Sequence, residues 1–229
     1  MTALAGQLAV VTGGSSGIGA ACAAALAAEG AAVVSFARRF AERAVRAPNA
    51  GEVVEVQLDV TDEVAVAARF AALPDPDLVV CAAGTGTFGP ITGETAAALR
   101  VMLDVHVVGT MLCAREALRR MIPHRAGHIV AIGSHVVHRS FPDCGGYTAA
   151  KAGQAGVLRV LAEEARPHNI RVTNVLPGAT DTPIWDDRPD FDRSKMLRPA
   201  DVASFLVALV SRRGISVEEV TIMPPAGAL

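Results

Sequence analysis

The chain has 229 residues, a length that α/β proteins commonly use for a single domain. Apolar residues make up 51% of it but aromatic residues only 4%, so the core must be built from aliphatic side chains. A formal net charge of −2 gives no electrostatic reason to expect nucleic acid as a partner, and the apolar runs stay well short of the roughly 20 residues that cross a bilayer.

The N-terminal residues and the cysteines bear on the compartment in which the protein works. Residues 1–5 have neither the basic region nor the cleavage site of a secretory signal peptide. The cysteines are widely spaced and form no CxxC pair; they are Cys22, Cys81, Cys113 and Cys144. We therefore expect reduced thiols in a cytoplasmic protein, without a disulfide framework or a bound metal.

Short apolar segments and helical segments alternate along the whole chain. Strands are predicted at residues 8–12, 32–36, 53–56, 78–80, 128–132, 171–175 and 219–223. Helices are predicted at residues 18–29, 40–47, 64–73, 95–121, 147–166 and 200–212. Apolar strands that alternate with helices indicate a parallel β-sheet covered on both faces, so we predict a doubly wound, three-layer αβα fold in a single domain, residues 1–229.

A glycine-rich loop joins the first predicted strand to the first predicted helix. It reads Gly13-Gly14-Ser15-Ser16-Gly17-Ile18-Gly19. In that position glycines let the backbone approach a pyrophosphate closely, and the helix N-terminus offers free N–H groups and the positive end of its dipole. The alternative is a tight turn with no ligand, but the place of the loop between a strand and a helix favours a dinucleotide site.

The second predicted strand ends in two arginines, Arg38 and Arg39. Folds that bind NAD usually have an acidic residue near this point for the ribose 2′-hydroxyl, whereas an arginine accommodates the 2′-phosphate of NADP. No acid stands at this strand end, so the pattern favours NADP, with NADPH preferred over NADH. The alternative is a solvated arginine pair.

A tyrosine and a lysine share one face of the predicted helix 147–166. Tyr147 is the only tyrosine of the chain, and Lys151 is one of two lysines against 19 arginines. At this i, i+4 spacing the ammonium can lower the phenol pKa, which otherwise lies near ~10, and can bond a ribose hydroxyl. Ser134 follows the strand 128–132 and can hydrogen-bond a substrate carbonyl beside the tyrosine.

In order and spacing these segments resemble the classical short-chain dehydrogenase/reductase family over essentially the whole chain. The matching segments are Thr12–Gly19, Asp59-Val60, Ala83-Gly84, Ser134, Tyr147 with Lys151, and Pro177-Gly178 with Thr182. The resemblance implies a seven-stranded Rossmann-type sheet, a homodimer or homotetramer, and Tyr147 as the general acid/base. It further implies that Ser134 orients the carbonyl, while Lys151 lowers the tyrosine pKa and holds the nicotinamide ribose.

The resemblance also implies where the cofactor lies. Asp59 and Val60 would contact the adenine, and Thr182 the nicotinamide carboxamide. The complete set of candidate cofactor residues is Gly13, Ser15, Ser16, Gly17, Ile18, Gly19, Arg38, Arg39, Asp59, Val60, Ala82, Gly84, Tyr147, Lys151, Pro177, Gly178, Thr180 and Thr182.

Two positions depart from the family. Its Asn-Asn-Ala-Gly after the fourth strand is Cys81-Ala82-Ala83-Gly84 here, a change that should weaken a supporting hydrogen bond. His106 stands where the family has an asparagine that holds a water next to the catalytic lysine. Histidine can both donate and accept hydrogen bonds, so His106 is either a proton-relay residue of the catalytic set or a packed helix histidine.

Several residues are candidates for the substrate side. By the resemblance, the residues after Ser134 and also Cys144 line the substrate pocket, and His138 is a further candidate for that lining. His135 and His138 lack an evident third ligand for a metal. Trp185 lies in a substrate loop at about residues 178–197, as a lid aromatic or as a packing anchor.

The sequence thus predicts an NADP(H)-dependent oxidoreductase that interconverts a carbonyl and a primary or secondary alcohol on a small substrate. The alternative is an NADP(H)-binding sensor or scaffold without turnover. Ser134, Tyr147 and Lys151 favour the enzyme, and only His106 supports the alternative. Enoyl reduction or dehydration would keep the enzyme but change its chemistry. We expect neither nucleic acid nor a membrane as a partner.

Overall fold

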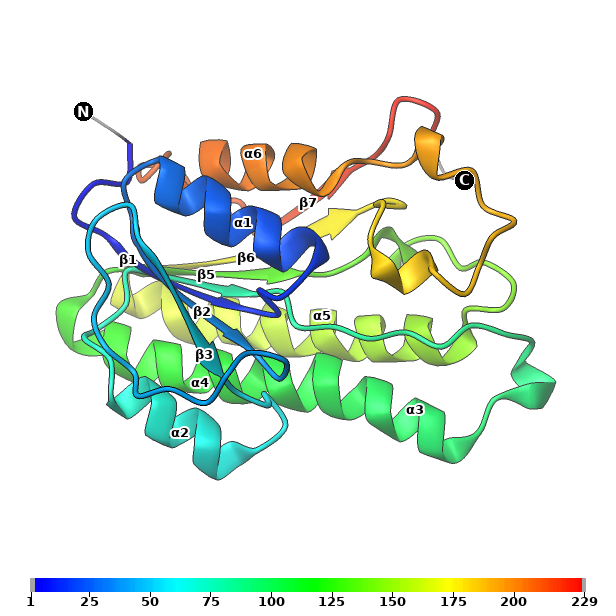
Figure 1. Cartoon of the computed structure of the whole chain (residues 1–229), viewed down its shortest axis with the longest axis horizontal. Helices are drawn as coiled ribbons and strands as arrows, with labels where there is room; N and C mark the ends of the chain where they lie inside the picture. The colour runs from blue at the N-terminus through cyan, green and yellow to red at the C-terminus, as the bar shows by residue number, and fades with distance from the viewer. Residues whose placement is uncertain (1–2, 228–229) are drawn as a thin grey trace.

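The protein is described by a computed structural model that covers residues 3–227. Seven parallel strands form one sheet in the order β3-β2-β1-β4-β5-β6-β7 (Figure 1). The strands are β1 Leu8–Thr12, β2 Ala32–Ala37, β3 Val53–Gln57, β4 Leu78–Cys81, β5 Gly127–Ile132, β6 Ile170–Pro177 and β7 Glu219–Ile222. The predicted seven-stranded, doubly wound Rossmann-type sheet is confirmed.

The order of the strands reverses between β1 and β4. Val10, in the middle of β1, is paired with Val34 of β2 on one side and with Val79 of β4 on the other. These strands are buried on both faces, which explains their continuous apolar sequences. In open α/β sheets the ligand binds at the carboxyl ends of the strands where the order reverses, so the fold directs attention to the loops after β1 and β4.

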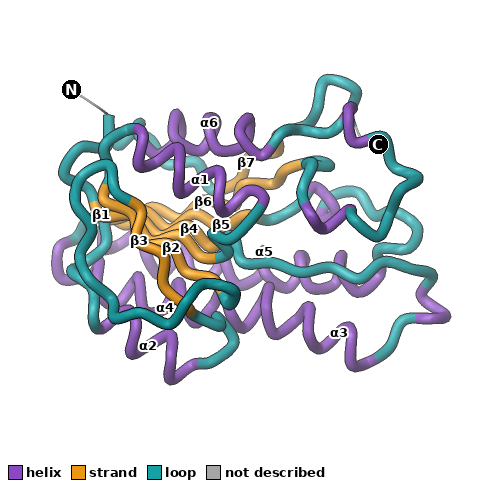
Figure 2. The backbone as a smooth tube through the Cα atoms, viewed as in Figure 1, coloured by secondary structure: helices purple, strands orange, loops and turns teal. Residues whose placement is uncertain are grey.

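Helices cover both faces of the sheet, as Figure 2 shows. On one face lie α1 Gly17–Ala28 and α6 Pro199–Val210, which pack on each other and on an aliphatic cluster that includes Val11, Val33 and Val175. On the other face lie α2 Glu63–Ala71, α3 Ala96–Leu103, α4 Thr110–Met121 and α5 Gly145–Ala165. The aliphatic core predicted from the composition therefore forms two layers, one on each side of the sheet.

The helix predicted at 95–121 is interrupted. Between α3 and α4 the chain forms a wide π-helical turn, Asp104–Gly109, without leaving the helix axis. Gly109 lies so close to Val60 that a Cβ at this position would stand 2.6 Å from the valine Cγ2. The π turn carries His106, whose side chain is 1% exposed. Such turns often occur at functional sites.

The helical stretch Ala96–His124 is long and apolar enough, by length and composition, to span a membrane, and 39% of its most apolar part is buried inside the protein. It carries charged residues along its length, among them Arg100, Asp104 and Glu116. Its apolar side packs against α5 and the sheet. These contacts are those of a helix that covers one face of the sheet.

The helix predicted at residues 40–47 is wrong. From residue 41 to residue 49 the chain forms no regular structure and is mostly exposed. A helix of this length is marginal in water unless it buries an apolar face, and only Val45 packs against the core here. An ion pair between Arg46 and Glu52 holds the end of the segment instead.

Candidate active site

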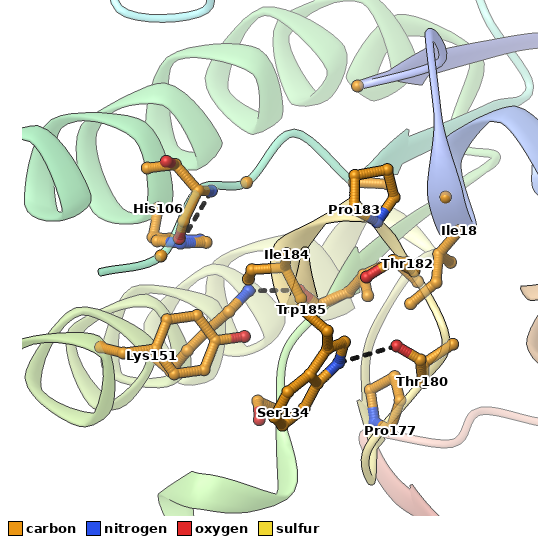
Figure 3. A pocket seen from close by; sticks show the side chains of 18 of the residues that line it. Ile18, His106, Ser134, Lys151, Pro177, Thr180, Thr182, Pro183, Ile184 and Trp185 are labelled. Atoms are coloured by element: carbon orange, nitrogen blue, oxygen red, sulfur yellow. Dashed lines mark hydrogen bonds between the residues drawn. The ribbon is translucent and has the colours of Figure 1, made fainter. Parts of the chain in front are cut away.

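All candidate cofactor and catalytic residues line a single cavity of about 990 Å³. The cavity lies at the carboxyl ends of β1, β2, β4, β5 and β6. Figure 3 shows residues around it that include Ser134 after β5, Lys151 on α5 and Trp185 in the loop after β6. Its two ends differ in chemistry. One end is formed by the glycine-rich loop and the arginines after β2, and the other by Ser134, Tyr147 and the substrate loop.

The glycine-rich loop forms a cradle that fits a pyrophosphate. Gly13 has a φ of +73°, and a Cβ there would stand 2.6 Å from the Ala82 carbonyl oxygen. A Cβ on Gly19 would collide with the backbone of Gly13 in the same way. Helix α1 begins at Gly17, and the side chain of its N-cap residue, Ser16, accepts no hydrogen bond from the helix. The free N–H groups of α1 therefore face a space shaped for an anion.

Beside this cradle lie the two arginines after β2. The Arg39 guanidinium donates to the Ser16 hydroxyl at 3.2 Å, so it reaches the start of α1. Arg38 is exposed at the cavity edge. At the next strand end, the Asp59 carboxylate accepts from both the N–H and the hydroxyl of Thr61, at 3.0 and 2.8 Å. Val60, which follows Asp59, is buried.

The segment Cys81-Ala82-Ala83-Gly84, which lacks the asparagines of the family, is held by hydrogen bonds to Thr12 that were not predicted from the sequence. The Thr12 hydroxyl, at the end of β1, accepts hydrogen bonds from the backbone N–H groups of Ala82 (3.1 Å) and Ala83 (3.2 Å). Thr12 is 1% exposed. A threonine on the neighbouring strand thus holds the loop after β4, which lines the cofactor end of the cavity.

Ser134 and Tyr147 form the reactive end of the cavity. Ser134 follows β5, and its hydroxyl lies near that of Tyr147, on the first turn of α5, and acts to lower the pKa of the tyrosine. The Ser134 oxygen also accepts from the Val136 N–H at 3.3 Å, which fixes its orientation. The Lys151 ammonium, one turn further along α5, lies 5.9 Å from the centre of the Tyr147 ring. The structure therefore brings the three predicted catalytic side chains together.

Burial controls the acid–base properties of this group. It raises the pKa of Tyr147 to about 12, against the opposing effect of the Ser134 hydroxyl. It lowers the pKa of Lys151 from 10.5 to about 7. Burial therefore outweighs the Ser134 hydroxyl in its effect on the tyrosine pKa, and Lys151 is only partly charged near pH 7.

Two residues that the sequence analysis missed hold the lysine. The Lys151 ammonium donates to the Ile132 carbonyl oxygen at 2.7 Å and to Gln154 Oε1 at 3.1 Å. The Gln154 amide in turn donates to the Thr110 hydroxyl at 2.8 Å. All of these side chains are buried. The lysine is therefore fixed by a chain of hydrogen bonds that runs from β5 through α5 to the start of α4.

The His106 ring lies next to Tyr147, but its hydrogen bond is to the loop after β4. Its Nε2 is 2.6 Å from the carbonyl oxygen of Thr85, in the loop after β4. Its ring meets the Tyr147 ring edge-on at 5.6 Å, and its Nδ1 is buried without a hydrogen-bond partner among the described residues. Burial and, to a smaller extent, the nearby Lys151 charge lower the His106 pKa to about 3. The ring is therefore neutral at physiological pH.

Aromatic side chains gather at the substrate end. Trp185, in the loop after β6, lines the cavity and donates its Nε1–H to the Thr180 carbonyl oxygen at 2.9 Å (Figure 3). It stacks on Phe88, with ring centres 6.1 Å apart, and Phe88 lies 5.4 Å from Tyr147. Phe88 was not predicted, because a single aromatic residue in a loop has no sequence pattern of its own.

The two histidines after Ser134 differ in position. His135 lines the cavity, as does Cys144. The suggestion that His138 joins the lining is wrong: its ring is exposed and lies 2.7 Å from the Glu219 carboxylate on β7. Within residues 3–227 no group of three potential metal ligands comes together.

The fold and the site define a class: an α/β protein with a glycine-rich cradle at one end of a cavity and the hydroxyl groups of Ser134 and Tyr147 at the other. The family follows from comparison with known proteins. The sequence profile of the family described as short chain dehydrogenase matches residues 7–192. The chain belongs to this family, as its motifs predicted, and is an oxidoreductase that acts on alcohol or carbonyl groups.

Individual relatives agree with this assignment. An uncharacterized oxidoreductase of Staphylococcus haemolyticus is 32% identical, over 98% of this chain and 100% of its own. The 2-dehydro-3-deoxy-L-rhamnonate dehydrogenase (NAD(+)) of Sphingomonas sp. is 32% identical over 84% of this chain and 81% of its own. The structure of an alcohol dehydrogenase from the archaeon Thermococcus sibiricus, complexed with 5-hydroxy-NADP, is similar with a TM-score of 0.85 and 26% identity, covering 97% of this chain and 98% of that one.

Proposed function

We propose that this protein is an NADP(H)-dependent oxidoreductase that interconverts a carbonyl and a primary or secondary alcohol on a small substrate. One observation carries the proposal: Tyr147, with Ser134 and Lys151 beside it, lines the same cavity as the glycine cradle and the arginines after β2. The proposed proton donor and the proposed dinucleotide site thus line one cavity.

The roles of the side chains follow from their positions. The Ser134 hydroxyl donates a hydrogen bond to the substrate carbonyl oxygen and holds it beside Tyr147. The Tyr147 hydroxyl delivers a proton to that oxygen in reduction and takes it back in oxidation. The Lys151 ammonium stabilises the phenolate that remains. The bound nicotinamide supplies or accepts the hydride.

The preference for NADP rests on Arg38 and Arg39. Both arginines line the cofactor end of the cavity, where they can pair with a 2′-phosphate. One solved relative is named as a complex with an NADP analogue, and one sequence relative is named as an NAD(+) enzyme. The named relatives therefore do not favour one cofactor over the other, and Arg38 and Arg39 favour NADP.

We also propose that the protein forms a homodimer or homotetramer in the cytoplasm. Four apolar side chains are exposed on neighbouring helices on one side of the sheet: Val101 on α3, Val108 in the π turn, Met111 on α4 and Val160 on α5. A second copy of the chain could cover them. The four cysteines are free thiols, three of them buried, which fits a reducing compartment.

A panel of small ketones, aldehydes and alcohols, assayed with each of NADPH, NADH, NADP and NAD, tests the proposal. We expect steady turnover with at least one carbonyl or alcohol compound and a lower KM for NADPH than for NADH. Binding of NADPH without turnover of any compound would instead support the sensor or scaffold. Turnover of enoyl compounds alone would change the reaction class.

A further inference from the structure

The positively charged side chains of the substrate loop, at about residues 178–197, differ in whether they form ion pairs. Arg193 is paired with Asp181 at 2.6 Å and Asp186 at 3.1 Å, and Lys195 with Asp192 at 3.3 Å. Arg188 pairs with no carboxylate in the described residues 3–227, although Asp187 precedes it directly. The loop thus leaves one arginine charge uncompensated, and this arginine lines the cavity.

Aromatic rings hold the Arg188 guanidinium. Its central carbon lies 5.1 Å from the centre of the Phe88 ring and 4.6 Å from that of Phe191. Rings that meet the face of a guanidinium fix its plane but leave the N–H groups at its edge free to donate. Phe88, Phe191 and the neighbouring Trp185 all line the cavity.

Two contacts place Arg188 near the reacting hydroxyl. Phe88 touches both Arg188 and Tyr147, whose ring centre is 5.4 Å away. The Arg188 charge also lies close enough to Cys144, the residue before the first turn of α5, which carries Tyr147, to oppose the rise that burial causes in the pKa of that thiol. Arg188 and Tyr147 therefore both neighbour the ring of Phe88.

Other charged side chains also line the cavity or lie near Arg188. Asp143 and Asp187 line it as well, but neither forms an ion pair with Arg188. Lys151 is committed to Ile132 and Gln154. Arg38 and Arg39 lie at the cofactor end. Arg188 is therefore the cation available to a negatively charged substrate near Tyr147.

We propose that Arg188 binds an anionic group of the substrate, a carboxylate, so that the compounds interconverted are an oxo acid and the corresponding hydroxy acid. The proposal rests on the proposed oxidoreductase function. The planar guanidinium can hold the two carboxylate oxygens side by side, and the short path from Arg188 to Tyr147 calls for a carbonyl only a few bonds from the carboxylate. A phosphate ester has the same charge chemistry and is distinguished by the test.

Matched pairs of neutral and charged substrates provide the test. Pyruvate, acetoacetate and levulinate place the carbonyl at increasing distance from the carboxylate, and each is compared with its methyl ester; dihydroxyacetone phosphate is compared with dihydroxyacetone. We expect the protein to prefer at least one acid to its ester. In Arg188→Met, kcat/KM for that acid should fall roughly 10- to 100-fold, mainly through KM, while the value for the ester stays the same.

Arg139→Met is the matched control. Arg139 also stacks on an aromatic ring, 5.6 Å from the centre of Phe141, but it is exposed and does not line the cavity. This variant should behave as wild type with acids and esters alike. Equal use of acids and esters by the wild type, or equal losses on both in Arg188→Met, would overturn the proposal. A preference for the phosphate ester alone would replace the carboxylate by a phosphate.

A binding measurement separates this proposal from the proposed function. Trp185 is the only tryptophan of the chain and lies in the same aromatic cluster, so its fluorescence can report binding of the same acids in the presence of NADPH. If binding of an acid is weakened in Arg188→Met but no compound is reduced, the anion site stands and the oxidoreductase function fails. If carbonyl compounds are reduced but the acids bind equally to both proteins, the anion site fails alone.

Discussion

At the scale of single residues, burial and hydrogen bonding together determine the pKa of Lys151. Its ammonium is 4% exposed and has two acceptors, the Ile132 carbonyl and the Gln154 amide. Burial favours the uncharged amine and brings the lysine pKa to about 7, whereas an acceptor favours the ammonium. The fraction of Lys151 that is charged near neutral pH therefore depends on Gln154.

Substitution of Gln154 should shift the pH–rate profile. If the ammonium is the working form, activity falls as pH rises through the lysine pKa. Gln154→Leu removes an acceptor, lowers that pKa and should move the fall to lower pH; Gln154→Glu adds a negative charge, raises the pKa and should move the fall to higher pH. The measurement is kcat against pH at saturating cofactor. Unchanged profiles in both variants would show that Gln154 has only a structural role.

His106 should act through the loop that it holds rather than through its own titration. The contact of 2.6 Å makes Nε2 the donor to the Thr85 carbonyl oxygen. His106→Leu leaves this oxygen unpaired and should raise KM for NADPH about fivefold, the effect of one lost hydrogen bond of about 1 kcal/mol. His106→Asn, which keeps an N–H donor, should lose less.

The pH dependence distinguishes this role from a relay. Because the pKa of His106 is about 3, its ring stays neutral between pH 5 and pH 9. His106→Leu should therefore keep the wild-type shape of the pH–rate profile in that range. A profile that changes shape, together with a fall in kcat at saturating NADPH, would instead identify His106 as a relay residue.

At the scale of elements, the segment after β2 carries the two arginines on which the proposed preference for NADP depends. The expected helix at residues 40–47 is replaced by an exposed irregular segment, which leaves Arg38 and Arg39 on a turn at the cavity edge. Arg39 is bonded to Ser16 at the start of α1, so the cation lies beside the phosphate cradle.

Replacement of both arginines should change the choice of cofactor. Each charge-assisted hydrogen bond to a phosphate contributes ~1.5–3 kcal/mol. In the double variant Arg38→Ser/Arg39→Ser we therefore expect NADPH binding to weaken at least about tenfold while NADH binding stays nearly constant. Arg43→Ser, in the same exposed segment but outside the cavity lining, is the control. Equal affinity of the wild-type protein for NADH and NADPH would refute the assignment.

At the scale of the whole molecule, parallel topology explains how much the sequence could predict. Seven apolar strands separated by helices indicate one sheet whose carboxyl ends meet, so motifs far apart in sequence could be expected in one cavity. The same reasoning could not find Gln154, Phe88 or Arg188. Their partners are set by the packing of helices and loops, and a lone glutamine, phenylalanine or arginine forms no spacing pattern that points to a role.

Side-chain packing also explains why the helix predicted at residues 95–121 differs from the observed one. A helical periodicity covers residues 95–121, but the periodicity does not reveal the π turn at Asp104–Gly109, where the helix widens next to Val60. The length of Ala96–His124 and its apolar composition reflect contacts with the sheet and α5 and the exposed side chains for which we propose a second copy of the chain.

The central claim is that, in this cavity, the substrate carbonyl receives a hydride on its carbon and a proton on its oxygen. It is tested most directly by the fate of deuterium from NADPH that carries deuterium at both C4 positions of the nicotinamide, in wild type and in Tyr147→Phe. We expect one deuterium on the alcohol carbon of the product in wild type. In Tyr147→Phe, turnover should fall by ~10²–10⁴-fold while NADPH still binds. A product without deuterium, or a Tyr147→Phe variant that keeps more than about a tenth of the wild-type rate, well outside the range for general acid–base transfer, would contradict the account.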